Sequence, residues 1–131
     1  DFTNFYRVID GFVAQGGPMF ENEADKKPLK DGQYAIPSEL ISITKLGDGY
    51  ISFDSEDGYA DETGFLNSFA VGRDLNSGES WLLHCYGALG MGRDNELDSG
   101  GTELYIVNGG AQRYLDRNVT IFGRVMLKLL N

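Results

Sequence analysis

Near its start the chain carries three residues whose types and spacing could do chemistry: Arg7, Phe12 and Gln15. If this stretch forms two strands joined by a tight turn, the two-residue period of a strand places Arg7 on one face between Phe5 and Ile9. A guanidinium among apolar neighbours is costly unless it is paired or used. The residues also allow a plainer interpretation, in which Arg7 pairs with a carboxylate, Phe12 belongs to the core and Gln15 to a turn.

The elements that position these residues are predicted to be β-strands. Short apolar or alternating runs, separated by turn residues, recur along the chain, and this pattern is typical of strands. The chain contains 18 glycines and 3 prolines, which indicates many turns. The helical signal is sparse, with one candidate at Met126–Leu130. The predicted strands are Phe5–Ile9, Phe12–Gln15, Leu40–Lys45, Tyr50–Phe53, Trp81–His84, Ala88–Met91, Leu104–Val107 and Val119–Val125.

Composition narrows both the fold class and the function. At 131 residues the chain has the size of a single domain. Its 11 Lys and Arg against 20 Asp and Glu give a net charge of −9, which argues against a nucleic-acid partner. Hydrophobic residues make up 41% of the chain, as in a folded globule. No apolar run of ~18 residues is present, so no membrane insertion is expected.

No metal and no cofactor are expected. Cys85 is the only cysteine and His84 the only histidine, so the chain can complete neither an internal disulfide nor a four-ligand zinc site. The segments Glu21–Asp31 and Asp54–Glu62 are rich in charge and are predicted to be solvated surface loops.

The stretch around Arg7 belongs to a larger pattern. Residues 5–17 read F-Y-R-V-I-D-G-F-V-A-Q-G-G. This string resembles the signature F-H-R-V-I-x-G-F-x-x-Q-G-G of the cyclophilin family of peptidyl-prolyl cis-trans isomerases. Four further motifs resemble the family's motifs and occur in the same order. They are Tyr34–Leu40, Gly87–Gly92, Gly101–Ile106 and Leu115–Val125. The chain looks like a divergent branch of the family found in proteobacteria.

The resemblance implies a mainly β fold, a cyclophilin-like closed antiparallel barrel of eight strands with few helices. The motifs run from Phe5 to Val125, so the family's first and last elements have no counterpart in this chain, and we expect the whole protein to be longer. The spacing of the motifs predicts one domain over 1–131, incomplete at both ends, with insertions around 18–33 and 46–80.

The resemblance also implies a rotamase that catalyses rotation about X–Pro peptide bonds and assists protein folding. Arg7 would hydrogen-bond to the prolyl nitrogen, Phe12 would hold the proline ring and Gln15 would bind the substrate backbone. The remaining residues implied to bind substrate are Val13, Gly92, Arg93, Glu103, Tyr105, Tyr114 and Leu115.

Three departures from the family change the rim of the implied pocket. The family's Trp is Tyr114, its Gln is Glu103, and its His falls on Val119. High cyclosporin affinity is therefore not expected. Glu103 adds a negative charge that could pair with Arg7 and reduce activity. The alternative function is a catalytically weak cyclophilin-like module that binds proline peptides or acts as a chaperone.

The resemblance further implies the partners. We expect proline-containing peptides or unfolded protein clients, bound by a monomer. An exported, periplasmic location is favoured, with the cytoplasm as the alternative, because the chain opens at Asp1 and a signal peptide could precede it.

Overall fold

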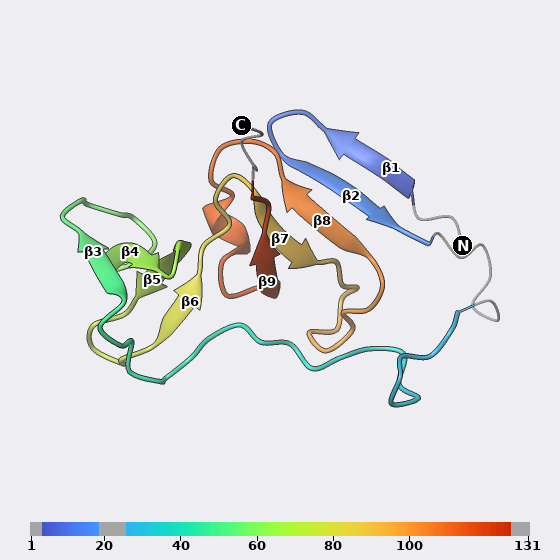
Figure 1. Ribbon diagram of the computed structural model, residues 1–131, viewed down its shortest axis with the longest axis horizontal. Coiled ribbons are helices and arrows are strands. Elements are labelled where there is room, and N and C mark those ends of the chain that lie inside the picture. The colour runs from blue at the N-terminus through green and yellow to red at the C-terminus, as the bar shows by residue number, and fades with distance from the viewer. Residues whose placement is uncertain (1–3, 19–25, 127–131) are drawn as a thin grey trace, which may run out of the picture.

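The computed structural model describes residues 4–18 and 26–126 and is mainly β (Figure 1). The mainly β class with few helices, predicted from the sequence, is confirmed. The strands are β1 (Asn4–Ile9), β2 (Val13–Gly17), β3 (Tyr50–Phe53), β4 (Glu62–Leu66), β5 (Phe69–Arg73), β6 (Ser80–Leu82), β7 (Ala88–Met91), β8 (Leu104–Val107) and β9 (Ile121–Arg124), and the 3-10 helix η2 is Arg113–Leu115.

Five strands form an antiparallel sheet in the order β1-β2-β8-β7-β9. The turn between β1 and β2 contains Gly11 at φ 70°, a backbone conformation that glycine adopts without strain. The core of this sheet lies on one face, and Val107 in it is fully buried. The buried residues that form this core are Val13, Ala88, Tyr105, Val107 and Ile121.

The other four strands form a second antiparallel sheet in the order β3-β4-β5-β6. Figure 1 shows it in the opposite half of the molecule from the five-stranded sheet. Asn67 and Ser68 make the turn between β4 and β5, both at positive φ, as a two-residue hairpin turn requires. Neither β4 nor β5 is predicted from the sequence, because Gly64 and Gly72 interrupt their apolar alternation.

The predicted strand Leu40–Lys45 is wrong. This segment belongs to a long irregular stretch that runs along both sheets (Figure 1). It contributes one isolated bridge, between Ser42 and Ser80. Ile41 and Ile43, whose alternation suggested a strand, remain exposed because no neighbouring strand continues the ladder. The predicted helix Met126–Leu130 lies, apart from Met126, outside the described residues.

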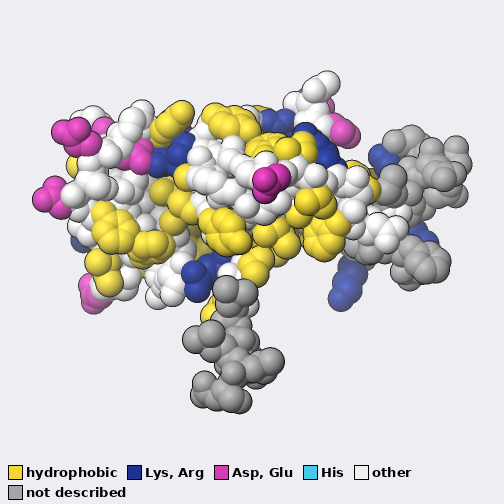
Figure 2. All heavy atoms as spheres, turned by 90° about the horizontal axis from the view of Figure 1, so that it is seen from above, with side chains coloured by type: hydrophobic (Ala, Val, Ile, Leu, Met, Phe, Trp, Pro, Cys, Tyr) yellow, Lys and Arg dark blue, Asp and Glu magenta, His cyan; other side chains and the backbone are white. Residues whose placement is uncertain are grey.

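Large apolar side chains also lie at the surface. Figure 2 shows them spread over the face seen from above. Phe5 and Val8 on β1 are each 63% exposed, and Ile51 on β3 is 67% exposed. Among the described residues, no helix is long and apolar enough to cross a membrane.

Candidate active site

The register of the five-stranded sheet brings Arg7 and Gln15 to one face. Arg7 pairs with Gln15, Gln15 with Tyr105, and Tyr105 with Gly90 across four neighbouring strands. Residues directly opposite each other in antiparallel strands project from the same side. The Arg7 guanidinium accordingly donates through Nη1 to Gln15 Oε1 at 3.2 Å. This row of side chains forms the base of the site.

Phe12 joins Arg7 from the turn that precedes β2. The Arg7 guanidinium lies 5.8 Å from the centre of the Phe12 ring, within the range of a cation–π contact. On its other side Phe12 stacks on Tyr114, with ring centres 6.4 Å apart and an interplanar angle of 19°. The structure therefore brings Arg7, Phe12 and Gln15 together, as their spacing predicts, and places Tyr114 beside them.

A β-bulge adds Tyr6 to the same site. The β1–β2 register shifts between Phe5 and Arg7, and Tyr6 is the extra residue. Bulges re-aim a side chain next to many active sites. Here the Tyr6 hydroxyl donates to Glu103 Oε2 at 2.6 Å. Partial burial and this bond to Glu103 raise the pKa of Tyr6 to about 12, although Gln15 and Arg7 oppose the shift. Tyr6 was not predicted as a site residue, because the sequence pattern does not reveal the bulge.

Glu103 occupies the end of the site and engages Tyr6. The sequence-based expectation that Glu103 could pair with Arg7 is wrong among the described contacts, because the carboxylate bonds to Tyr6 and Arg7 bonds to Gln15. The Glu103 carboxylate covers Gly17, where a side chain would collide with it. It is half-buried. The site thus holds an anion and a cation side by side without an ion pair between them.

Tyr105 lies beneath the surface of the site. It is 7% exposed and belongs to the core, and the half-buried Phe12 and Val119 pack against that core. Its hydroxyl points inward to His84 Nε2 at 2.7 Å. Burial and the nearby Asp116 carboxylate raise the pKa of Tyr105. Val13, also predicted to bind substrate, is 3% exposed and lies in the same core.

The short helix η2 forms one rim of the site. Tyr114 is 59% exposed while it stacks on Phe12, and Leu115 is half-buried. A tyrosine has an apolar ring and a polar tip, so it can cover the site and still face water. The predicted residues Tyr114 and Leu115 are therefore placed beside Phe12.

Gly92 lies against the opposite end of Gln15. Its amide donates to the Glu103 carbonyl at 2.6 Å, and a Cβ at this position would lie 3.4 Å from Gln15 Nε2. Gly92 therefore leaves room for the Gln15 amide above the backbone.

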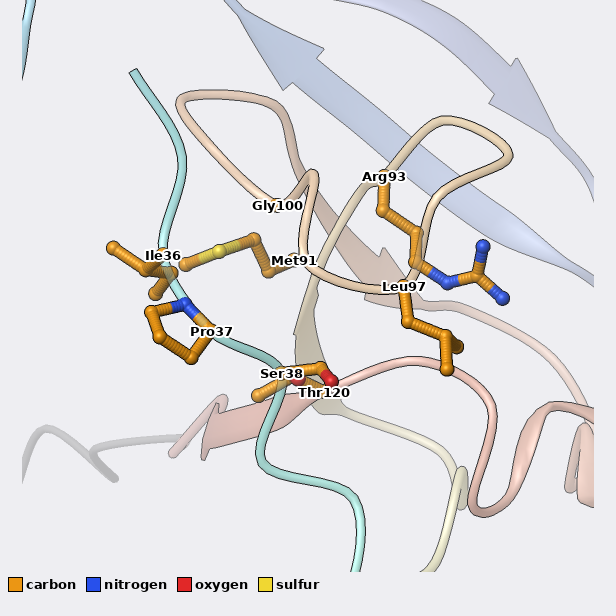
Figure 3. Close-up of a pocket in the computed structure, with 8 residues that line it drawn as sticks. All are labelled: Ile36, Pro37, Ser38, Met91, Arg93, Leu97, Gly100 and Thr120. Atoms are coloured by element: carbon orange, nitrogen blue, oxygen red, sulfur yellow. The ribbon is translucent and has the colours of Figure 1, made fainter. Parts of the chain in front are cut away.

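The Arg93 side chain binds the loop that follows β7 and the segment between η2 and β9. Its guanidinium donates to the carbonyls of Asn118 at 2.9 Å and Asp94 at 2.7 Å, and to the Asn118 side chain. Figure 3 shows it at the edge of a separate hollow. Because its side chain is engaged in these bonds, Arg93 can contact a peptide only through its backbone. The lining of this hollow is Ile36, Pro37, Ser38, Met91, Arg93, Leu97, Gly100 and Thr120.

The described residues contain no group of three or more His, Cys, Asp or Glu arranged to hold a metal ion. Cys85 is half-buried, and burial raises the pKa of its thiol. A raised thiol pKa disfavours the thiolate, which is the nucleophilic form. At the site itself, Arg7 supplies hydrogen-bond donors and a positive charge next to the Phe12 ring.

Comparison with known proteins decides the family. A family model described as cyclophilin type peptidyl-prolyl cis-trans isomerase/CLD matches residues 1–130. The chain belongs to the cyclophilin family. The crystal structure of cyclophilin AquaCyp293 from Hirschia baltica is similar to this cyclophilin chain, with a TM-score of 0.68 and 28% sequence identity. The similarity covers 93% of this chain and 48% of that one, so the chain spans about half the length of that cyclophilin.

None of the curated proteins matches this cyclophilin chain. The family match and the structural match confirm the resemblance seen in the sequence and the cyclophilin-like fold class. Among the described residues, the strands form two sheets, and no ladder closes them into a ring.

Proposed function

We propose that this chain carries peptidyl-prolyl cis-trans isomerase activity. The observation that carries the proposal is the cluster of Arg7, Gln15 and Phe12 on one face of the sheet, with Arg7 bonded to the neutral amide of Gln15. Membership of the cyclophilin family supports the same activity.

The proposed chemistry needs no covalent intermediate. An X–Pro amide isomerises slowly because resonance gives its C–N bond partial double-bond character, with a barrier of ~18–20 kcal/mol. When the bond twists, the nitrogen lone pair localises and becomes a hydrogen-bond acceptor. The Arg7 guanidinium, held by Gln15 and Phe12, would donate to this nitrogen. Because the twisted amide accepts this bond and the planar amide does not, Arg7 would lower the barrier by differential binding.

The remaining residues would hold the proline and its flanking backbone. We propose that Phe12, Tyr105 and Leu115 form the proline pocket, with Val13 supporting it from the core and Tyr114 at its rim. Gln15 and the backbone at Gly92 and Arg93 would hold the peptide extended, and Glu103 would meet it at the far end. Tyr114 and Val119 supply no indole and no imidazole, so weak cyclosporin binding is expected.

The proposed partners are proline-containing peptides or unfolded clients, bound by a monomer. We also propose that residues 1–131 belong to one cyclophilin-like domain with insertions around 18–33 and 46–80. The strands β3, β4 and β5 fall within the second of these segments. Limited proteolysis that cuts within these segments while the fragments stay associated supports this organisation.

The experiment that tests the function is NMR exchange spectroscopy on an Ala-Pro peptide with a catalytic amount of the protein. We expect exchange cross-peaks between the cis and trans resonances that are absent without protein. Peptide binding without faster exchange would favour the alternative, a proline-peptide-binding module. If the protein neither binds the peptide nor speeds its exchange, both the isomerase function and the binding-module alternative are overturned.

A further inference from the structure

A buried chain of polar side chains leads from Tyr105, beneath the site, to the acidic loop 54–62, and the proposed mechanism uses none of its members except Tyr105. His84 is fully buried. Its Nε2 lies 2.7 Å from the Tyr105 hydroxyl, and its Nδ1 lies 3.1 Å from Asp116 Oδ1. Arg113 continues the chain, since its Nε donates to Asp116 Oδ2 at 2.6 Å and its Nη1 donates to Asp57 Oδ2. We call these residues, from Tyr105 to Asp57, the buried relay.

Hydrogen-bonding rules fix the role of each group in the buried relay. The Asp116 carboxylate accepts from the His84 amide at 2.8 Å as well as from Arg113. An ionised carboxylate can only accept, so His84 Nδ1 carries the proton that faces it. In the neutral ring Nε2 then accepts from the Tyr105 hydroxyl. The Arg113 hydrogen bond also lowers the pKa of Asp57, which keeps the outer end ionised.

The buried relay also holds the rim of the site. Arg113 is the first residue of η2, which carries Tyr114 and Leu115. The residue before it, Gln112, donates its amide to the His84 carbonyl at 2.8 Å. A displacement of Arg113 or His84 would therefore move the turn that stacks on Phe12.

Two residues of the acidic loop 54–62 contact Arg113. Asp57 forms an ion pair with Arg113, and both side chains are largely buried, with 16% and 13% of their surfaces exposed. The Arg113 guanidinium also lies 5.3 Å from the centre of the Tyr59 ring. Through these two contacts the loop is held against Arg113, at the outer end of the buried relay.

We propose that His84, Asp116, Arg113 and Asp57 are positioning residues for the isomerase site. The buried relay holds the Tyr105 ring at the floor and η2 at the rim, and the loop 54–62 acts on the site through it. A buried hydrogen-bonded network favours one geometry, because each broken link leaves a buried polar group without a partner. This role rests on the proposed isomerase function.

The test is a double-mutant cycle on kcat/KM for the Ala-Pro peptide. Asp57→Asn removes the charge at the outer end, and Tyr105→Phe removes only the hydroxyl at the inner end. We expect losses of about fivefold and about tenfold, and a double variant no worse than Tyr105→Phe alone, since linked residues give non-additive effects. Asp54→Asn is the matched control, because Asp54 is an exposed carboxylate of the same loop. It should leave kcat/KM unchanged.

A second pair of variants separates positioning from folding. His84→Gln retains a polar atom near the position of Nε2, and His84→Asn retains one near Nδ1. We expect His84→Gln to keep more of the wild-type kcat/KM, although both variants lower the melting temperature. All rates are compared at a temperature where circular dichroism shows each variant folded.

Each outcome bears on a different claim. Additive effects, or variants that lose melting temperature but keep kcat/KM, would overturn the positioning role and leave the isomerase function standing. A wild-type chain that neither accelerates exchange nor binds the peptide would overturn the function and this role with it.

Discussion

The two sheets hold the same three residue types, a tyrosine, a glutamate and an arginine, but connect them differently. In the four-stranded sheet, the Tyr50 hydroxyl donates to Glu62 Oε1 at 3.0 Å. Arg73 Nη1 donates to the same oxygen at 2.9 Å and forms an ion pair with it. The guanidinium also lies 5.4 Å from the centre of the Tyr50 ring. In this sheet the positive charge is therefore satisfied within the protein.

In the five-stranded sheet the tyrosine and glutamate bond to each other, but the arginine does not join them. Tyr6 donates to Glu103, while Arg7 donates to the uncharged Gln15. Among the described residues, no ion pair links Arg7 to a carboxylate. Arg7 is exposed, so its remaining donors face solvent.

The difference shows what makes an arginine available for chemistry. Both arginines lie over an aromatic ring, so this contact does not distinguish them. The two arginines differ in the residue that accepts the hydrogen bond from the guanidinium, which is Gln15 for Arg7 and Glu62 for Arg73. An amide partner orients Arg7 without neutralising it, whereas a carboxylate partner gives Arg73 a structural role.

The largest expected effect on stability comes from one glycine in each sheet. A Cβ at Gly90 would overlap the Tyr105 ring, and one at Gly64 would overlap the Ile51 carbonyl. Overpacking of this kind costs about 1–3 kcal/mol, so both Gly90→Ala and Gly64→Ala should lower the free energy of unfolding in urea. Gly90→Ala should also lower kcat/KM at least about tenfold, because it displaces the floor of the site. Equal activity losses in both variants would contradict the separation of the sheets.

The next effect comes from making the surroundings of Arg7 resemble those of Arg73 in the four-stranded sheet, which pairs with Glu62. Gln15→Glu gives Arg7 a carboxylate partner of the same shape. We expect kcat/KM to fall about tenfold with little change in stability, because exposed ion pairs contribute only about 0.2–1 kcal/mol. Part of the activity should return in 1 M salt, which screens such pairs. Unchanged activity would show that the charge of the partner does not matter.

The converse change removes the carboxylate partner of Arg73 in the four-stranded sheet. Glu62→Gln removes the ion pair with Arg73, whose side chain is 30% exposed against 26% for Glu62. We expect the free energy of unfolding to fall by about 1 kcal/mol or less, and kcat/KM to stay at the wild-type value. A loss of activity in Glu62→Gln would show that the four-stranded sheet contributes to the site.

The smallest effect concerns alkaline pH. Partial burial and their glutamate partners raise the pKa of Tyr6 and of Tyr50 to about 12, from the usual value of 10. Each tyrosine therefore contributes stability that is fully present below pH 10 and is lost as the pH rises towards 12. Tyr6→Phe and Tyr50→Phe should each flatten the loss of melting temperature between pH 10 and 12. A profile as steep as that of the wild type would contradict the raised pKa.

The five-stranded sheet could largely be predicted from the sequence, and the four-stranded sheet only in part. All five strands that carry the site coincide with predicted apolar runs, within a few residues at their ends. In the second sheet, β3 was predicted with its observed bounds and β6 within two residues, whereas β4 and β5 were missed because Gly64 and Gly72 interrupt their apolar alternation. Leu40–Lys45 shows the opposite error, since its alternation lacked a neighbouring strand to pair with.

The site was predicted in part. Arg7, Phe12 and Gln15 lie together because one hairpin carries all three, and local spacing suffices to show this. Tyr6 depends on a bulge, and the contact of His84 with Tyr105 joins residues from distant segments. Such contacts follow from the tertiary packing and leave no periodic signal in the sequence.

The central claim is that Arg7 acts on the twisted X–Pro bond rather than on the bound planar peptide. The most direct measurement compares Arg7→Ala with Arg73→Ala, taking peptide affinity and the exchange rate at saturating peptide separately. For Arg7→Ala we expect about a 100-fold slower saturated rate with nearly unchanged affinity, as for the loss of one transition-state donor. Arg73→Ala should keep both. Weaker peptide affinity with an unchanged saturated rate in Arg7→Ala would contradict the claim.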